Sequence, residues 1–242
     1  MLVVIPARYA SGRLPGKPLV DIAGKPMIIR TFERCISAVA PEHVIIATDD
    51  DRIRTAVEAF GIQCVMTSSD CLTGTDRIAE VADLYPRPFY INVQGDEPCF
   101  NPDDITKLIK AATERPESIW NGYCPIRSHE EFVSRGVPKF VFSEDERLLY
   151  ASRAPVPGSK SGEFVFGHRQ VCAYSFPAAG LKAFRAQGKK TPLEAVEDIE
   201  ILRFLELGFE VRLIAMSEVS VPVDHPSDVA VAERRLLEMG WS

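Results

Sequence analysis

The feature that most constrains the fold is a regular alternation of apolar runs and amphipathic segments in the first half of the 242-residue chain. The apolar runs have the length of strands, and the segments between them carry apolar residues at helical spacing. Predicted strands cover residues 2–5, 43–48, 62–67 and 88–98, the last running into a loop, and predicted helices cover residues 25–40, 49–61, 73–85 and 102–115. This alternation predicts an α/β protein whose mainly parallel sheet is flanked by helices on both faces and joined by right-handed crossovers.

The alternation loosens over about residues 119–176, where short strand-like runs follow one another. These runs cover residues 118–126, 137–143, 147–152 and 169–176. Alternation then returns, with a predicted helix at 191–208, a strand at 209–216 and a helix at 226–240. We therefore predict a single domain over residues 1–242 in which about 119–176 form an inserted, β-rich subdomain or subunit-contact region.

Composition excludes several classes of function. The formal net charge of −6 argues against nucleic-acid binding, and no apolar stretch is long enough to span a bilayer. The apolar run at residues 2–5 is too short for a signal peptide. The six cysteines form no C-x-x-C pair and the four histidines are dispersed, which favours reduced cysteines, a cytoplasmic location and no zinc site.

The loop after the first strand, PARYASGRLPGKP at residues 6–18, combines positive charge with glycine and proline. Arg8, Arg13 and Lys17 supply cations, and Gly12 and Gly16 allow the backbone to approach a ligand closely. Together these residues suit a polyphosphate. The loop is not a Walker A motif, because proline follows the lysine where Ser or Thr would be needed. A merely solvated basic loop is the alternative interpretation.

Two aspartates follow apolar runs at separate places in the chain. Asp96 lies in VQGDEP and Asp224 lies in VPVDHP. The carboxyl ends of parallel strands form the usual ligand edge of such a sheet, and two carboxylates there suit Mg²⁺ with phosphate oxygens. Each aspartate also has a simpler interpretation as the cap of a following helix that begins with proline.

Several motifs, taken in order along the chain, resemble those of the 3-deoxy-manno-octulosonate (Kdo) cytidylyltransferases, also called CMP-Kdo synthetases. The motifs are IPARYASGRLPGKPL, TGTDRIAEV, VQGDEP, SRAPVP, PLE and VD-P-D. The resemblance implies a Rossmann-like nucleotidyltransferase fold and transfer of CMP from CTP to a 2-keto-3-deoxy sugar acid, with release of pyrophosphate. It also implies Mg²⁺ dependence, a homodimer formed through the inserted region, and a part in lipopolysaccharide or capsule synthesis.

The resemblance also implies roles for individual residues. On the nucleotide side it implies triphosphate binding by Arg8, Arg13 and Lys17, and further nucleotide contacts at Gly74, Arg77 and Gln94. It implies Mg²⁺ ligation by Asp96 and Asp224, which with Lys17 form the catalytic set. It implies sugar-acid binding by Arg153, His168 and Glu200, with Arg153 holding the carboxylate. For His168, a core or interface position is the alternative.

The chain departs from the family pattern on the sugar-acid side. Cys172 stands where the family has a tyrosine, and Ile201 stands where it has a glutamine. These departures leave three acceptors open: Kdo, its 8-amino analogue, or a nine-carbon ulosonic acid. A remoter alternative is a catalytically silent nucleotide-binding module, against which the presence of both aspartates argues. The expected chemistry is an in-line attack of the sugar hydroxyl on the α-phosphorus, without a covalent enzyme intermediate.

Overall fold

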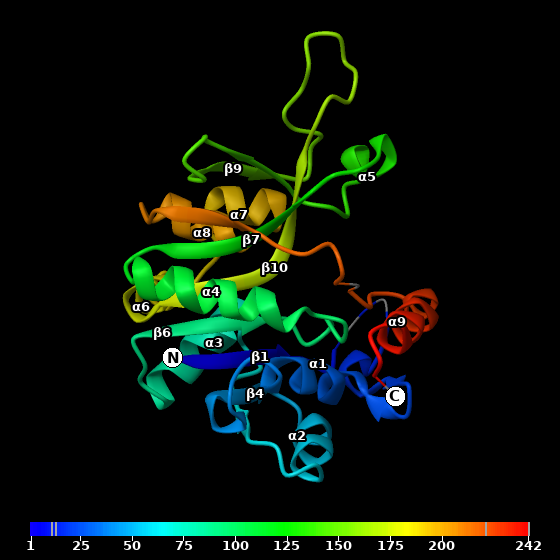
Figure 1. Ribbon diagram of the computed structural model, residues 1–242. Coiled ribbons are helices and arrows are strands. Elements are labelled where there is room, and N and C mark those ends of the chain that lie inside the picture. Colours follow the sequence, from blue (N-terminus) through cyan, green and yellow to red (C-terminus); the bar gives the residue numbers. More distant parts are fainter. Residues whose placement is uncertain (11, 13, 221, 242) are drawn as a thin grey trace.

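The computed structural model describes residues 1–10, 12, 14–220 and 222–241. In this part of the chain a nine-stranded sheet follows the order β11-β7-β10-β6-β1-β4-β5, with β8 and β9 continuing from β10 (Figure 1). The strands are β1 Leu2–Ala7, β4 Val44–Thr48, β5 Cys64–Met66, β6 Phe89–Val93, β7 Ile119–Pro125, β8 Lys139–Phe142, β9 Leu148–Ser152, β10 His168–Pro177 and β11 Val211–Ala215. β1 pairs in parallel with β4 and β6, as β4 does with β5 and β11 with β7, which confirms the predicted mainly parallel sheet.

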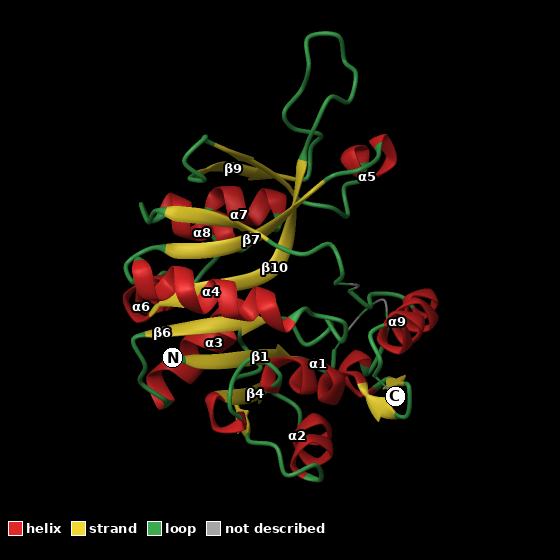
Figure 2. Cartoon of the chain, viewed as in Figure 1, coloured by secondary structure: helices red, strands yellow, loops and turns green. Residues whose placement is uncertain are grey.

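Helices cover both faces of this sheet (Figure 2). The helices are α1 Met27–Ile36, α2 Asp51–Glu58, α3 Gly74–Leu84, α4 Pro102–Glu114, α5 His129–Val133, α6 Ala178–Ala186, α7 Pro192–Glu197, α8 Ile201–Glu206 and α9 Pro226–Glu238. Alternate residues of β1 point to opposite faces, so that Val3 and Ile5 pack with α1, α2 and α4 while Leu2 and Val4 pack with α3, α6 and α8. Because both faces of β1 are covered by helices, its residues are apolar without alternation.

The helices that follow β4, β5 and β6 begin at polar caps. The side chains of Asp50, Thr73 and Asn101 each accept a hydrogen bond from a backbone N–H in the first turn of α2, α3 and α4. These caps fix where each helix leaves the strand ends, and Thr73 thereby brings the start of α3 to the carboxyl edge of the sheet.

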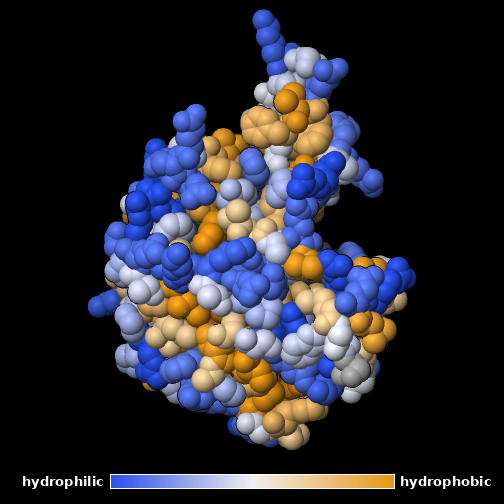
Figure 3. Space-filling model, viewed as in Figure 1, coloured by the Kyte–Doolittle hydropathy of each residue, from blue (hydrophilic) through white to orange (hydrophobic). Residues whose placement is uncertain are grey.

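The segment from β7 to β10 contains the four strands predicted there. β7 and β10 pair within the central sheet, whereas β8 and β9 extend from β10. Residues 153–167, between β9 and β10, project from the body (Figure 1). Apolar side chains gather at the base of this projection, below a hydrophilic tip (Figure 3). The segment includes Val165 and Phe166, which are 70% and 55% exposed. The bounds 119–176 of a separate subdomain, and its part in subunit contact, stay predictions.

Two single-turn helices, a small hairpin and the last helix complete the fold. The single-turn helices η1 Lys17–Leu19 and η2 Pro41–His43 precede β2 and β4, and a small hairpin joins β2 Asp21–Ile22 to β3 Lys25–Pro26. Helix α9 packs on this hairpin through a third apolar cluster that includes Ile22, Val223 and Leu236. Among the helices of the described ranges, none is long and apolar enough to cross a membrane.

The structure differs from the sequence-based prediction in three places along its helices. The predicted helix over residues 191–208 is divided into α7 and α8, because Asp198 adopts left-handed angles of φ 51° and ψ 49°. Helix α5 and helix α6, which follows β10 directly, were not predicted. The division at Asp198 matters for the site, since it turns the start of α8 toward the carboxyl edge of the sheet.

A buried ion network fixes α7 and α8 on α3. The guanidinium of Arg203, fully buried, donates two hydrogen bonds of 2.6 Å to Glu194 and one of 2.9 Å to Asp76. It also lies 3.6 Å from the ring centroid of Phe184. Glu194 is buried as well, so that its charge has no access to water. Arg203 therefore joins three helices and positions the chain on either side of Asp198.

We expect Arg203→Met to lower the free energy of unfolding by about 3–5 kcal/mol, because it leaves the buried Glu194 carboxylate without a cation. Denaturant titration followed by circular dichroism measures this loss. Arg235→Met is the matched control, since the Arg235–Glu238 pair lies at the surface, and it should change stability by less than about 0.5 kcal/mol. Equal stability of the two variants would contradict the anchoring role of Arg203.

Candidate active site

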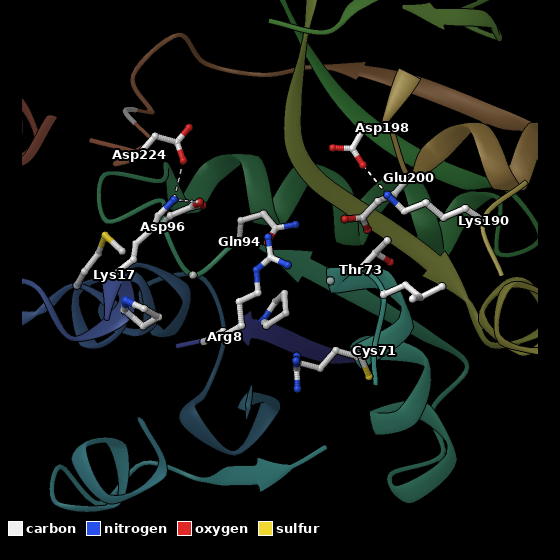
Figure 4. A pocket seen from close by; sticks show the side chains of 18 residues that line it. Arg8, Lys17, Cys71, Thr73, Gln94, Asp96, Lys190, Asp198, Glu200 and Asp224 are labelled. Atoms are coloured by element: carbon white, nitrogen blue, oxygen red, sulfur yellow. Dashed lines mark hydrogen bonds and ion pairs between the residues drawn. The ribbon is translucent and has the colours of Figure 1, made fainter. Parts of the chain in front are cut away.

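A cavity of about 440 Å³ opens at the carboxyl edge of the sheet. Its walls come from the loop after β1, from η1, from the start of α3, from the loop after β6, from the α7–α8 turn and from the segment before α9 (Figure 4). The lining residues are Pro6, Ala7, Arg8, Lys17, Pro18, Met27, Cys71, Leu72, Thr73, Gly74, Arg77, Gln94, Gly95, Asp96, Lys190, Asp198, Glu200 and Asp224. The cavity thus lies where parallel α/β sheets usually bind ligands.

At one end of the cavity a lysine bridges two aspartates. Lys17 Nζ lies 2.5 Å from Asp96 Oδ2 and 2.7 Å from Asp224 Oδ1 (Figure 4). Burial lowers the pKa of Lys17, but the charges and hydrogen bonds of the two carboxylates outweigh it, so that the pKa is raised and the side chain stays an ammonium. The backbone N–H of Val223 also donates to the carbonyl oxygen of Asp96, which pairs the two loops.

The position of Lys17 depends on the glycine before it. Gly16 has φ 66°, a left-handed conformation that glycine adopts without strain, and its N–H donates to the carbonyl oxygen of Tyr9. A Cβ atom at Gly16 would lie 3.1 Å from the Tyr9 hydroxyl oxygen. The compact turn that results begins η1 at Lys17 and aims its side chain at the strand ends.

The position of Asp96 also depends on a glycine. A Cβ atom at Gly95 would lie 2.9 Å from both the carbonyl oxygen of Pro6 and Cδ1 of Ile28, closer than real Cβ contacts allow. The loop after β6 therefore passes against β1 only because residue 95 has no side chain. The Thr31 hydroxyl donates to the Gly95 carbonyl oxygen and holds it there.

The predicted nucleotide-side residues line the same cavity. Gly74 lies against the amide of Gln94, since a Cβ atom at Gly74 would be 3.3 Å from Gln94 Nε2. Arg77 is 4% exposed and pairs with Asp49 at 3.1 Å, so that its charge is already partly balanced. Within the described residues, no hydrogen bond or ion pair engages the exposed Arg8 guanidinium. Arg8 is thus a cation available to an anionic ligand, whereas Arg13 lies outside the described residues.

The far wall of the cavity is formed by the α7–α8 turn (Figure 4). The Glu200 carboxylate accepts hydrogen bonds from the backbone N–H and the hydroxyl of Thr75, at 3.0 and 2.5 Å, and so caps α3. Burial raises the pKa of Glu200. Lys190 Nζ lies 2.5 Å from Asp198 Oδ1 on the same wall. Lys190 and Asp198 were not predicted as site residues, because both fall in a sequence pattern typical of an ordinary helix and the segment before it.

Arg153 and His168, predicted to bind the sugar acid, do not line this cavity. The Arg153 guanidinium donates to the carbonyl oxygens of Arg135, Glu197 and Asp198, at 3.0, 2.5 and 2.9 Å. It therefore supports the turn at Asp198. His168 packs among aromatic rings on β10 and neighbouring segments, those of Tyr123, Phe142 and Phe166.

The two departures from the family pattern also lie away from the cavity lining. Ile201 is fully buried in the apolar cluster beneath α8, and Cys172 packs against the same cluster. Burial raises the pKa of the Cys172 thiol to about 12. Neither side chain is therefore a charged or exposed group of the cavity.

Comparison with known proteins identifies the family. A family model described as Cytidylyltransferase matches residues 2–213. The chain belongs to the cytidylyltransferase family. Two relatives, each named 3-deoxy-manno-octulosonate cytidylyltransferase, share this assignment. The one from Protochlamydia amoebophila is 38% identical and the alignment covers 96% of this chain and 93% of the relative, while the one from Geobacter metallireducens is 41% identical with 93% of each covered.

A solved structure is also similar to this protein in its fold. It is described as CMP:2-keto-3-deoxy-manno-octonic acid synthetase complexed with CTP, and it matches with a TM-score of 0.88 and 35% identity over 99% of this chain and 98% of that chain. The family and the nucleotidyltransferase fold predicted from the motifs are thereby confirmed, and this cytidylyltransferase is an enzyme of the nucleotidyltransferase class.

We expect Gly95→Ala to destabilise the protein by about 1–3 kcal/mol, because the added methyl group meets a backbone carbonyl that cannot move freely. Thermal unfolding measures the effect. Gly158→Ala is the control, since a Cβ atom there has no neighbour within 4 Å. A Gly95→Ala protein that unfolds at the wild-type temperature would contradict the close approach of the loop after β6 to β1.

We expect His168 to titrate below its ordinary pKa of 6.5, because burial disfavours the charged imidazolium. The unfolded chain then takes up the proton more readily than the folded one. Stability from this residue is complete above pH 6.5 and is lost as the pH falls through the folded pKa. Titration of the His168 ring by NMR, assigned with His168→Gln, measures the pKa. A value above 6.5 would instead indicate a nearby anion.

Proposed function

We propose that this cytidylyltransferase transfers CMP from CTP to the anomeric hydroxyl of Kdo and releases pyrophosphate. Relatives that cover nearly the whole chain carry the name of that activity, and the similar solved structure contains CTP. The observation that carries the proposal is the convergence of Asp96 and Asp224 on one positive group, beside a cavity that also presents Arg8.

Asp96 and Asp224 suit a divalent cation, for which Mg²⁺ is our proposal. Oxygens of both carboxylates already face one point, the position of Lys17 Nζ. The described residues contain no group of three or more His, Cys, Asp or Glu that could hold a metal, so phosphate and water oxygens would supply the other ligands, as Mg²⁺ prefers. When bound, Mg²⁺ would neutralise phosphate charge and favour loss of the proton from the attacking hydroxyl.

The protein's own groups position the nucleotide. Arg8 and Lys17, together with Arg13, would bind the triphosphate and balance its charge. Gly74 and Gln94 would orient the nucleoside, since their close contact leaves backbone and amide groups facing the cavity. Cys71 also lines the cavity, but burial raises the pKa of its thiol to about 11, so that it stays protonated at neutral pH. This supports direct displacement at the α-phosphorus without a covalent intermediate.

The acceptor would lie toward the α7–α8 wall, where Glu200 faces the cavity. Acceptor binding by Arg153 and His168 stays a prediction, since both side chains contact other parts of the protein. Arg153 has a supporting role in any case, because it holds the turn that presents Asp198 and leads to Glu200. A homodimer through about residues 119–176, a cytoplasmic location and a part in lipopolysaccharide or capsule synthesis also stay predictions.

We expect pyrophosphate release with CTP, Mg²⁺ and Kdo, with CMP-Kdo identified by mass spectrometry. Asp96→Asn should lower kcat by at least about 10²-fold, because it removes negative charge from the cation site while preserving shape. Asp103→Asn is the control, since Asp103 is an exposed carboxylate at the start of α4, outside the cavity. Its turnover should match that of the wild type.

The same assay separates the alternatives. The panel includes ATP and GTP in place of CTP, and the 8-amino analogue of Kdo and a nine-carbon acid in place of Kdo. Strong preference for CTP is expected. Equal use of a purine triphosphate, or a nine-carbon acid preferred over Kdo, would contradict the proposed activity. Absence of turnover with every acceptor would favour a silent nucleotide-binding module.

A further inference from the structure

Lys17 occupies the point on which Asp96 and Asp224 converge. Its Nζ atom is within hydrogen-bonding distance of an oxygen of each carboxylate, at 2.5 and 2.7 Å. The three residues come from η1, from the loop after β6 and from the segment before α9, and Figure 4 shows the ammonium between the two carboxyl groups. The lysine side chain is 12% exposed, so that the contact is shielded from water.

Two carboxylates that face one point repel each other unless a cation lies between them. A lysine ammonium is compact and has three donors, so it can bond to both at once. A divalent cation would use the same oxygens and carry the same sign of charge. The ammonium and the metal therefore cannot occupy this point together.

We propose that Lys17 is the resident counter-ion of the Asp96–Asp224 site, and that a divalent cation enters by exchange with its ammonium, which moves to the triphosphate. The inference rests on the metal site of the proposed function. In the exchange, the divalent cation brings two positive charges to the two carboxylates in place of one. The released ammonium is then balanced by the negative charge of the phosphates, beside Arg8.

The exchange has a structural consequence for the C-terminal segment. Asp224 and His225 donate backbone hydrogen bonds to Asp228 in the first turn of α9, and Val223 donates to the carbonyl oxygen of Asp96. Lys17 therefore holds the start of α9 against the strand ends while no metal is bound. A metal ion that replaces the ammonium would take over this role, since it would bind the same two carboxylates.

Direct metal binding tests the proposal, with Mn²⁺ as the probe and electron paramagnetic resonance of free Mn²⁺ as the readout. The full-length protein is used without nucleotide. Lys17→Met should bind Mn²⁺ at least about tenfold more tightly than the wild type, because the metal no longer has to displace an ammonium. Lys17→Arg, which keeps the competing charge, should bind no more tightly than the wild type.

Lys190→Met is the matched control, since Lys190 lines the same cavity but pairs with Asp198. Lys190→Met should change the Mn²⁺ affinity by less than about threefold, because it only removes a positive charge that does not contact the two aspartates. An equal gain in Lys190→Met and Lys17→Met would overturn the proposal, as would an affinity of Lys17→Met no higher than that of the wild type. With α,β-methylene CTP present, the difference between Lys17→Met and the wild type should shrink or reverse, because the triphosphate then competes for the ammonium.

A second measurement uses only the wild-type protein. Acylation by acetic anhydride followed by peptide mass spectrometry reports how accessible each lysine amine is, with Lys25 as the internal reference. Mg²⁺ without nucleotide should increase the rate at Lys17 relative to Lys25, because its carboxylate partners are taken. An unchanged ratio at saturating Mg²⁺ would overturn the exchange. Both measurements need no turnover, so their failure is distinguishable from failure of the proposed cytidylyl transfer.

Discussion

One ammonium between two carboxylates is the contact on which the organisation of this site depends. Asp96 lies 79 residues after Lys17 in the chain and Asp224 lies 207 residues after it, yet both carboxylates are within hydrogen-bonding distance of the lysine ammonium. Such a cluster is stable only if each charge is opposed by another, because burial penalises a lone charge. The same requirement makes the cluster suitable for a phosphate-bound cation, since its carboxylates already share one focus.

The sheet brings these groups together. β1 and β6 are parallel neighbours, so that the loops after them leave the same edge. Gly95 allows those loops to touch, and the third apolar cluster seats α9 beside them. The opposite wall depends on two arginines instead: the buried Arg203 fixes α7 and α8 on α3, and the partly exposed Arg153 holds the carbonyl groups of the turn between them. The cavity therefore lies between two independently anchored walls.

The sequence was sufficient to predict the features that depend on local pattern. Strand and helix periods predicted the mainly parallel sheet, and polar residues after apolar runs located Lys17, Asp96 and the start of α3 at one edge. The division of the helix at Asp198 could not be predicted, because neither glycine nor proline marks it. Tertiary hydrogen bonds from Arg153 stabilise that left-handed residue, and they connect segments about 45 residues apart. The same contacts turn Arg153 away from the cavity that its motif suggested it would line.

The two departures from the family pattern, Cys172 and Ile201, affect mainly the packing of the protein interior. Ile201 is fully buried among apolar residues of α8 and the sheet, where a glutamine amide would need hydrogen-bond partners. Cys172 lies where the pairing of β10 with β7 shifts between Val171 and Tyr174, and the Asn121 amide donates to the carbonyl oxygens of Val171 and Ala173 on either side of it. A bulge of this kind re-aims side chains, and a small thiol fits it beside the Tyr174 hydroxyl. These substitutions can therefore affect the acceptor through the shape of the wall behind it, because the charged groups facing the cavity on that side are Lys190, Asp198 and Glu200.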